Sequence, residues 1–439
     1  MKRILKSAGT AGGSGKQIVR AYGFWLIVAA FLLAQVLIWF VLFQRFWFQD
    51  KSASSVHLYY FYAQRIAAGL VPYRDFSLEY PPVVVPVFYL PWLFSGPDFD
   101  RYFLWFEIET LVFSCSITVL MGLAARHFGL SLKQLAAVLL TYALAIVATG
   151  SLVQVRFDLL IAFLVILSLA FFLKGKKLLA WSFLGVGIML KLVPVLLAPL
   201  YFIGDYRQGR KRFWLGPMAM ALAALLIALP YALMAPAGLL RSFLNHLQRP
   251  VQLESTWALP FLWAKELLKI PVRTEFTYGS DNIVSMHTGV ISLLSGLVLA
   301  TVLALGYYAF YHSSREAGVN KAGGQAEIVR FAAISLLTFI LFGKVFSPQY
   351  VIWLLPLIPL AMGGGRRMIV ALFLVALLLT QYEYPYHYPQ LVGMSEFMVG
   401  EVTLRDLLLW AMLVLMLLPG NLVPAQASAS KERSADGHL

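Results

Sequence analysis

The sequence FWLIVAAFLLAQVLIWFVL, residues 24–42, decides the fold class. It contains no charged side chain, and a helix needs about 20 consecutive apolar residues to cross the bilayer core. A cleavable secretory signal has a shorter apolar core and a small-residue cleavage site, whereas this run continues into FQRFWF. We therefore interpret it as a retained first membrane span.

Further apolar runs follow along the chain, at residues 104–125, 157–173, 213–232, 290–311 and 407–423. Only 13% of the 439 residues are charged, against about 25% in soluble domains. The sequence therefore predicts an all-α, polytopic membrane helix bundle.

Basic residues indicate which loops face the cytosol. Clusters at residues 2–20, 126–133, 174–177, 207–212, 315–330, 366–367 and 431–433 hold 21 of the 35 Lys and Arg residues, whereas only five of the 21 acids lie in or beside them. By the positive-inside rule these segments are cytosolic. The net charge of +14 thus comes from basic residues at the ends of the predicted spans. We therefore expect no nucleic-acid partner.

This assignment divides the chain into a cytosolic tail (1–23), a transmembrane domain (24–423) and a second cytosolic tail (424–439). It places the long loops at about 46–101 and 234–287 on the extracytosolic face. Both flanks of residues 178–203 are basic, so Lys191 and Pro194 predict a broken hairpin there. With residues 83–94 as an interfacial or re-entrant helix, about ten crossings remain.

The first long loop contains PYRDFSLEYPP, residues 72–82. Either Asp75 or Glu79 is a candidate general base towards a sugar hydroxyl, and Arg74 beside Tyr73 is a candidate phosphate ligand. The alternative is a purely structural, ion-paired loop at the membrane surface.

Three charged residues lie at or inside apolar segments. Arg156 and Asp158 flank one phenylalanine at the start of a predicted span, and Lys191 interrupts another. Charges at such depth pair with each other or line a wet cavity. Asp158 has a structural alternative, because an acid in the first turn favours the helix dipole. For Lys191 the alternatives are a phosphate ligand and a structural ion pair.

Two later segments combine hydrogen-bonding groups with aromatic rings. HLQRPVQLESTW, residues 246–257, offers Arg249, Gln252 and Glu254, a mixture suited to holding a sugar. GKVFSPQYVIW, residues 343–353, offers Lys344, Gln349 and Tyr350, although Tyr350 and Trp353 also suit an interfacial anchor.

Several familiar sites are missing from the sequence. It has no phosphate-binding glycine loop, no dinucleotide-binding turn, no metal-spaced histidine pair and no nucleophile elbow. Its one cysteine, Cys115, lies in an apolar run. We expect no cofactor. Binding of a divalent cation by the acids of the first loop is left as an alternative.

Taken in order, these motifs resemble the GT-C membrane glycosyltransferases, and more closely the family 87 group that includes polyprenol-phosphate-mannose-dependent mannosyltransferases. The pieces that carry the resemblance are PYRDF with EYPP (72–82), RFD (156–158), KLVP (191–194), QLES (252–255) and SPQYVIW (347–353).

The resemblance implies a sugar donor on a polyprenyl phosphate, a lipid or cell-envelope glycan acceptor, and an acid of the first loop as base. One position departs from the family pattern, since SSVH (54–57) stands where relatives often carry an aspartate. Asp50, Asp75 or Glu79 then supplies the base, unless the chain is non-catalytic. A lipid-linked sugar transporter and an oligosaccharide polymerase or ligase are the alternative functions.

Overall fold

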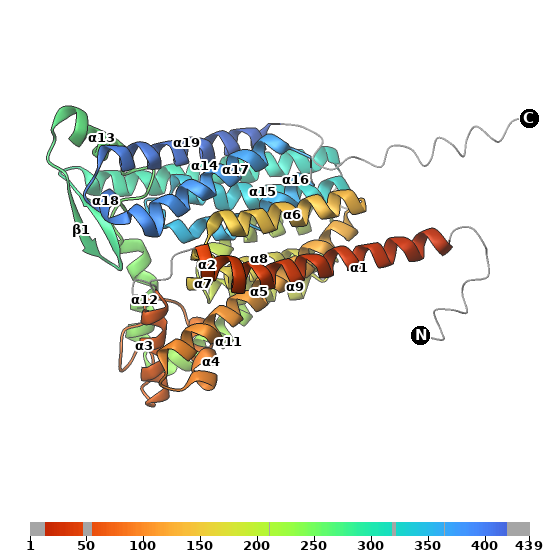
Figure 1. Ribbon diagram of the computed structural model, residues 1–439, viewed down its shortest axis with the longest axis horizontal. Helices are drawn as coiled ribbons and strands as arrows, with labels where there is room; N and C mark the ends of the chain where they lie inside the picture. The colour runs from red at the N-terminus through yellow and green to blue at the C-terminus, as the bar shows by residue number, and fades with distance from the viewer. Residues whose placement is uncertain (1–13, 47–54, 210, 318–321, 364, 419–439) are drawn as a thin grey trace, which may run out of the picture.

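Long helices packed side by side make up most of the computed structural model, which describes residues 14–46, 55–209, 211–317, 322–363 and 365–418. Figure 1 shows that α1 begins and α19 ends at the same end of this bundle. The long helices are α1 (Ser14–Leu37), continued by η2 (Ile38–Leu42) and α2 (Phe43–Phe46), α5 (Phe99–His127), α6 (Leu132–Thr149), α8 (Asp158–Leu173), α11 (Leu215–Met234), α14 (Thr288–Ala317), α15 (Ala322–Phe342), α17 (Arg367–Gln381) and α19 (Glu396–Leu417).

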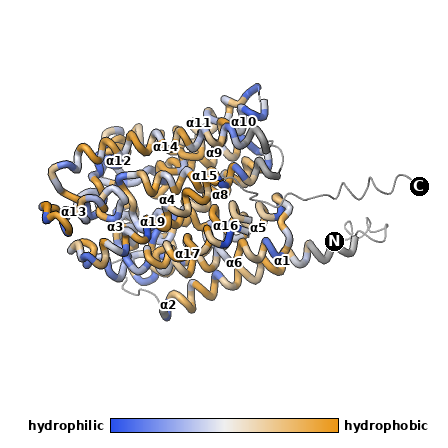
Figure 2. The backbone as a smooth tube through the Cα atoms, turned by 90° about the horizontal axis from the view of Figure 1, so that it is seen from above, coloured by the Kyte–Doolittle hydropathy of each residue, from blue (hydrophilic) through white to orange (hydrophobic). Residues whose placement is uncertain are grey.

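Six helices in the described part of the chain are long and apolar enough to cross a membrane. Figure 2 shows apolar residues along the helices, with hydrophilic ones gathered mainly towards the two ends of the bundle. Two of the six, α11 and α14, bury almost none of their side chains against the rest of the protein, so their apolar faces need lipid around them. The all-α, polytopic fold predicted from the sequence is confirmed, and the chain is a multi-pass membrane protein.

The segment with two basic flanks folds back on itself as expected. Helix α9 (Lys177–Ile188) ends before the Lys191–Pro194 break, η4 (Val193–Leu197) follows, and α10 (Ala198–Arg207) returns. At its base Lys177 Nζ lies 3.5 Å from Asp205 Oδ1, and Trp181 Nε1 donates to Asp205 Oδ2 at 3.1 Å. Both ends of the hairpin therefore lie on one side of the bundle.

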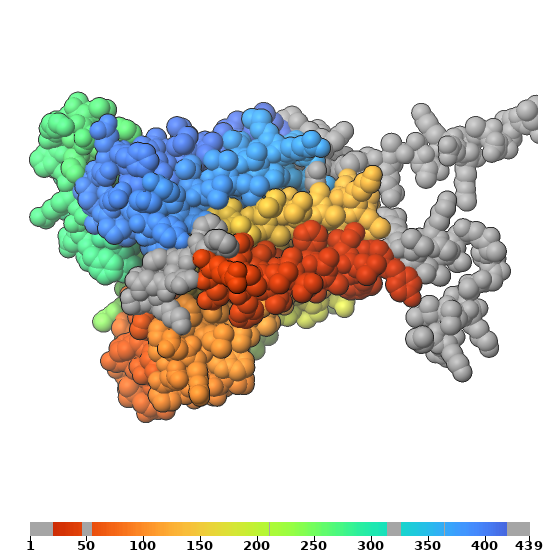
Figure 3. Space-filling model, in the orientation of Figure 1, coloured from red at the N-terminus to blue at the C-terminus, as the bar shows by residue number. Residues whose placement is uncertain are grey.

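The two long loops lie together at the end of the bundle opposite to the start of α1 (Figure 1). The first carries α3 (Val56–Ala67) and α4 (Val84–Ser95). Helix α4 coincides with the interfacial or re-entrant helix predicted at residues 83–94. In Figure 3 the helices of the first loop form a lobe that projects from the bundle. The second loop carries α12 (Pro236–Gln248), α13 (Leu259–Leu268) and an antiparallel hairpin of β1 (Arg273–Thr277) and β2 (Ser280–Val284). No strand in this loop was predicted from the sequence.

A second correction concerns the last span. The sequence placed the last apolar run at residues 407–423, but α19 already begins at Glu396. Glu401, Arg405 and Asp406 are buried within this helix by contacts with other segments, so an apolar run alone underestimates its length. The remaining short helices are α7 (Leu152–Val155), η5 (Pro348–Leu354), α16 (Leu357–Met362), η6 (Tyr382–His387) and α18 (Tyr388–Val392).

The predicted tails at 1–23 and 424–439 lie mostly outside the described residues, although α1 already begins at Ser14. Asp50, one of the three candidate bases, also lies outside them.

Candidate active site

A polar cavity lies where the two long loops, the start of α8 and η5 meet. Most of the side chains in its wall are polar or charged. The wall includes Tyr59, Glu79, Tyr80, Arg156, Asp158, Lys191, His246, Arg249, Ser347, Gln349 and Tyr350. The structure thus brings together many of the residues singled out in the sequence.

A buried ion pair forms one side of the polar cavity. Lys191 Nζ donates to Asp158 Oδ1 at 2.9 Å, and Trp353 Nε1 donates to the same oxygen at 2.7 Å. The lysine also lies 4.8 Å from the ring centroid of Tyr350. Asp158 therefore fixes the Lys191 ammonium at the cavity wall, while aromatic faces cover its other sides.

Two further cations border the polar cavity. Arg249 donates through Nη2 to Ser280 Oγ at 2.9 Å, and its buried Nε has no hydrogen-bond partner among the described residues. Arg156 donates through Nη2 to the Tyr384 hydroxyl at 2.8 Å. An arginine nitrogen left without a partner inside a protein is costly, so Arg249 retains capacity for a bound anion.

His246, on α12, lies between these cations. Burial, followed by the charges of Arg249 and Lys191, lowers its pKa to about 4. The imidazole is therefore neutral at neutral pH, and it adds hydrogen-bonding capacity to the wall without adding charge.

Glu79 is the acid of the first loop that lines the polar cavity. Asp75 is held elsewhere: Arg74 Nε donates to its Oδ1 at 2.9 Å, and the Val71 amide donates to its Oδ2 at 2.7 Å. These contacts, the Arg74 hydrogen bond first, lower the pKa of Asp75 to about 2. Tyr73 is buried, and its hydroxyl donates to the Tyr80 carbonyl at 2.6 Å.

An apolar groove adjoins the polar cavity. It has a volume of about 380 Å³, and its walls come from η4, α12, α14 and α15, including Leu192, Leu196, Leu299 and Phe339. The groove and the cavity share four residues, Lys191, His246, Arg249 and Tyr350. Cations therefore stand at the junction between an apolar compartment and a polar one.

Lys344 borders the groove at this junction. Its ammonium donates to the Leu247 carbonyl and to Ser292 Oγ, each at 2.9 Å. Burial, and then the nearby charge of Arg249, lowers the pKa of Lys344. Repulsion of this kind between neighbouring cations is relieved by a bound anion.

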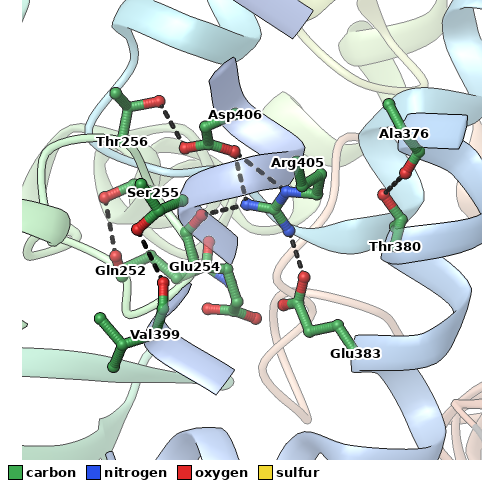
Figure 4. A network of polar contacts seen from close by, with 11 residues as sticks. Gln252, Glu254, Ser255, Thr256, Ala376, Thr380, Glu383, Val399, Arg405 and Asp406 are labelled. Carbon is green, nitrogen blue, oxygen red and sulfur yellow. Dashed lines mark hydrogen bonds and ion pairs between the residues drawn. The ribbon is translucent and has the colours of Figure 1, made fainter. Parts of the chain in front are cut away.

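Glu254 lies outside both cavities, in a buried network around Arg405 (Figure 4). Arg405 donates to the Glu254 carbonyl at 2.7 Å and pairs with Glu383 and Asp406. Burial, then the charge of Glu383, raises the pKa of Glu254 to about 8, so its carboxyl is protonated at neutral pH. The residue predicted to touch substrate instead lies among structural contacts.

Gln252 connects this network to the cavity wall. Its side-chain amide exchanges hydrogen bonds with Ser347 Oγ at 3.0 and 3.1 Å, and its backbone N–H donates to the Lys344 carbonyl at 2.9 Å. Ser347 lines the polar cavity. Gln252 therefore positions the segment that carries Lys344 and Gln349.

Sequence reasoning missed several wall and support residues. His246 belongs to a segment that was singled out, so its place beside Arg249 was within reach. Tyr278 and Gly279 also line the cavity, but their position depends on the strand pairing of β1 with β2. Arg405 could have been identified from the sequence, because a charged residue inside an apolar helix requires a partner. Among the described residues no group of three or more His, Cys, Asp or Glu side chains is arranged to hold a metal ion.

Comparison with known proteins adds one finding. A family model described as glycosyltransferase family 87 matches residues 78–323, more than half of the chain. The matched segment contains Glu79, Arg156, Asp158, Lys191 and Arg249. No curated protein matches the sequence.

Proposed function

Because the chain belongs to glycosyltransferase family 87, we propose that this membrane glycosyltransferase is of the GT-C type and takes a hexose, mannose in the first instance, from a polyprenyl phosphate. The acceptor is a hydroxyl group of a lipid or cell-envelope glycan on the extracytosolic face. One observation carries the proposal: an apolar groove and a polar cavity meet at a wall that contains Lys191, His246 and Arg249.

This arrangement matches the three chemical parts of such a donor. The isoprenoid chain fits the apolar groove, whose volume of about 380 Å³ is in the range of small-molecule sites. The phosphate then lies at the junction, within reach of Lys191, Arg249 and Lys344. The sugar extends into the polar cavity, where hydroxyl, amide and charged groups are available to hydrogen-bond it.

The charge of the polar cavity supports a phosphodiester as the ligand. Its wall carries three cations, Arg156, Lys191 and Arg249, and two carboxylates, Glu79 and Asp158. With His246 neutral, one positive charge is left over. A sugar linked to a polyprenyl phosphate carries one negative charge, which balances it inside a medium that strengthens electrostatic interactions.

The transfer step follows from this placement. Glu79 takes the proton of the acceptor hydroxyl as its oxygen attacks the anomeric carbon of the sugar. The bond from that carbon to the phosphate oxygen breaks, and its electron pair leaves with the polyprenyl phosphate. Lys191 and Arg249 stabilise the growing negative charge on the phosphate. Attack from the face opposite to the phosphate inverts the anomeric centre.

The extracytosolic assignment rests on the distribution of basic residues and on the grouping of both long loops at one end of the bundle. Gln349 and Tyr350 come to the same end from η5 and complete the sugar-binding wall. The Asp75–Arg74 pair lies outside this wall, which favours Glu79 as the base.

The test uses purified protein in lipid nanodiscs with decaprenyl-phosphate mannose as donor and octyl α-D-mannopyranoside as acceptor. We expect a dimannoside and free decaprenyl phosphate, both identified by mass spectrometry. Movement of the donor across liposomes with no new glycosidic bond contradicts a transferase and supports a transporter. Transfer of a preassembled oligosaccharide alone supports a ligase.

A further inference from the structure

The tip of the β1–β2 hairpin has an unusual backbone. Tyr278 and Gly279 form the two-residue turn, with φ angles of 53° and 69°. Two positive φ angles in succession define a type I′ turn, for which Asn-Gly is the preferred sequence. A bulky tyrosine is disfavoured in this region. Strained residues of this kind concentrate at functional sites.

Side-chain contacts hold this turn in place. Asn282 Nδ2 donates to the carbonyls of Thr277 and Ser280, both at 2.8 Å. Arg249 donates to Ser280 Oγ at 2.9 Å. The turn is therefore fastened directly to a cation of the polar cavity, and its position is defined by the same residues that define the site.

The second strand is also fixed to the loop that carries Arg249. The Leu253 amide donates to the Asp281 carbonyl at 3.0 Å, and the Ile283 amide donates to the Val251 carbonyl at 2.9 Å. The Tyr388 hydroxyl donates to Asp281 Oδ2 at 2.9 Å. A hairpin held along its length in this way presents its tip as a rigid feature.

The tip faces the proposed base. Tyr278 and Gly279 both line the polar cavity, and a methyl group placed on Gly279 would lie 3.4 Å from Glu79 Oε2. The Tyr278 residue remains 41% exposed, so it stands at the rim, where the cavity opens to water. The apolar groove does not include it.

From this arrangement we infer that the Tyr278 ring is the platform on which the acceptor sugar rests, and that it sets acceptor specificity. The inference depends on the proposed glycosyl transfer. The donor reaches the cavity from the groove, past Lys191 and Arg249, whereas Tyr278 lies beside Glu79, which must meet the acceptor hydroxyl. An exposed aromatic face suits the apolar face of a sugar ring, and the tyrosine hydroxyl remains in water.

The test compares Tyr278→Asn, Tyr278→Phe and wild type in nanodiscs with the same two substrates. Asparagine removes the ring but is the preferred residue for this turn, so the hairpin is retained. We expect the acceptor KM of Tyr278→Asn to rise about fivefold while the donor KM stays unchanged, because aromatic contacts of this kind are worth about 1 kcal/mol. Tyr278→Phe keeps the platform and stays within about twofold.

Phe276→Ala is the matched control. Phe276 is an aromatic residue on the same hairpin, is 70% exposed and does not line the cavity, so its loss leaves both KM values unchanged. An acceptor KM for Tyr278→Asn within about twofold of wild type overturns the inference, as does an equal rise in the donor KM.

Binding of octyl α-D-mannopyranoside, measured by tryptophan fluorescence, tests the proposed function and the Tyr278 platform separately. Wild-type protein that binds this acceptor but forms no dimannoside contradicts the proposed function alone. Equal acceptor affinities for wild type and Tyr278→Asn contradict the platform alone.

Discussion

Lys191 and Asp158 form an ion pair of 2.9 Å that joins the break of the α9–α10 hairpin to the first turn of α8. The pair is almost completely buried, and it holds one cation at the point where the apolar groove meets the polar cavity. Removal of one partner therefore affects both stability and donor binding.

We predict that Lys191→Met lowers the stability of the folded protein by about 3 kcal/mol, because the Asp158 carboxylate keeps only the Trp353 donor. The double variant Lys191→Met/Asp158→Asn should regain most of that stability but still bind donor weakly, since no cation is restored. Thermal unfolding and donor titration in nanodiscs measure the two effects. A double variant as unstable as the single one would show that the unpaired Asp158 carboxylate is not the cause of the lost stability.

The position of Glu79 in the cavity wall predicts that Glu79→Gln lowers kcat by at least about 100-fold, the usual contribution of a general base. The donor KM should change little, because the phosphate contacts lie on other residues. Asp75→Asn is the comparison, and we expect nearly wild-type turnover from it because Asp75 pairs with Arg74 outside the cavity. Equal loss in both variants would point to a structural role for the first loop.

A single glycine offers a way to block the apolar groove. Gly296 lines it, and a Cβ atom added at this glycine would meet no other atom within 4 Å. Gly296→Leu should therefore raise the donor KM about tenfold by occupying the space that we propose for the isoprenoid chain. Gly306→Leu is the control, because Gly306 lies on the same helix with equally open space but away from the groove. Similar KM values for the two variants would exclude the groove as the tail site.

The raised pKa of Glu254 predicts a pH dependence of stability. Its folded value of about 8 lies above its ordinary value of 4.5, so its contribution is fully present below about pH 4.5 and is lost as the pH rises through about 8. The loss approaches about 1.4 kcal/mol per pH unit between these two values and levels off above about pH 8. Between about pH 7 and 8 His246 does not interfere, because its pKa is about 4.

In that window Glu254→Gln should show a flatter fall of the unfolding temperature than wild type, since the amide imitates the protonated acid. Parallel curves for the two proteins would show that Glu254 is already ionised.

Sidedness can be tested at two exposed positions in a Cys115→Ser background. Met286 is 90% exposed at the end of the second long loop, and Lys211 is exposed in a basic cluster. An impermeant thiol reagent added to intact cells should label Met286→Cys and leave Lys211→Cys unmodified. The reverse pattern would place the proposed site in the cytosol. Position 254 is unsuitable as a probe because it is buried.

The sequence predicted the features that depend on local composition. Four of the apolar runs coincide with helices long and apolar enough to cross a membrane. The basic flanks with Pro194 predicted the hairpin that the Lys177–Asp205 contact closes. The start of α19 was missed, because Arg405 and its carboxylate partners come together only through segments far apart in the chain.

The candidate site was predictable as a set of residues but not as a geometry. Spacing along the chain identified Asp158 and Lys191 separately, yet their pairing depends on how α8 packs beside the hairpin. Glu79 and Asp75 are four residues apart, and only the fold separates a cavity-lining acid from an exposed ion pair. Tyr278 could not be identified from the sequence, because its place in the cavity wall depends on where the fold puts the turn between β1 and β2.

The shared wall of Lys191, His246, Arg249 and Tyr350 has a kinetic consequence. With the proposed polyprenyl-phosphate donor, one substrate is dissolved in the two-dimensional membrane, whereas a soluble glycan acceptor approaches from bulk water. The two concentrations that govern turnover are then expressed on different scales. The rate should follow the mole fraction of donor among the surrounding phospholipids. Adding inert phospholipid at constant total donor should therefore slow the enzyme by surface dilution, while the dependence on acceptor molarity stays the same.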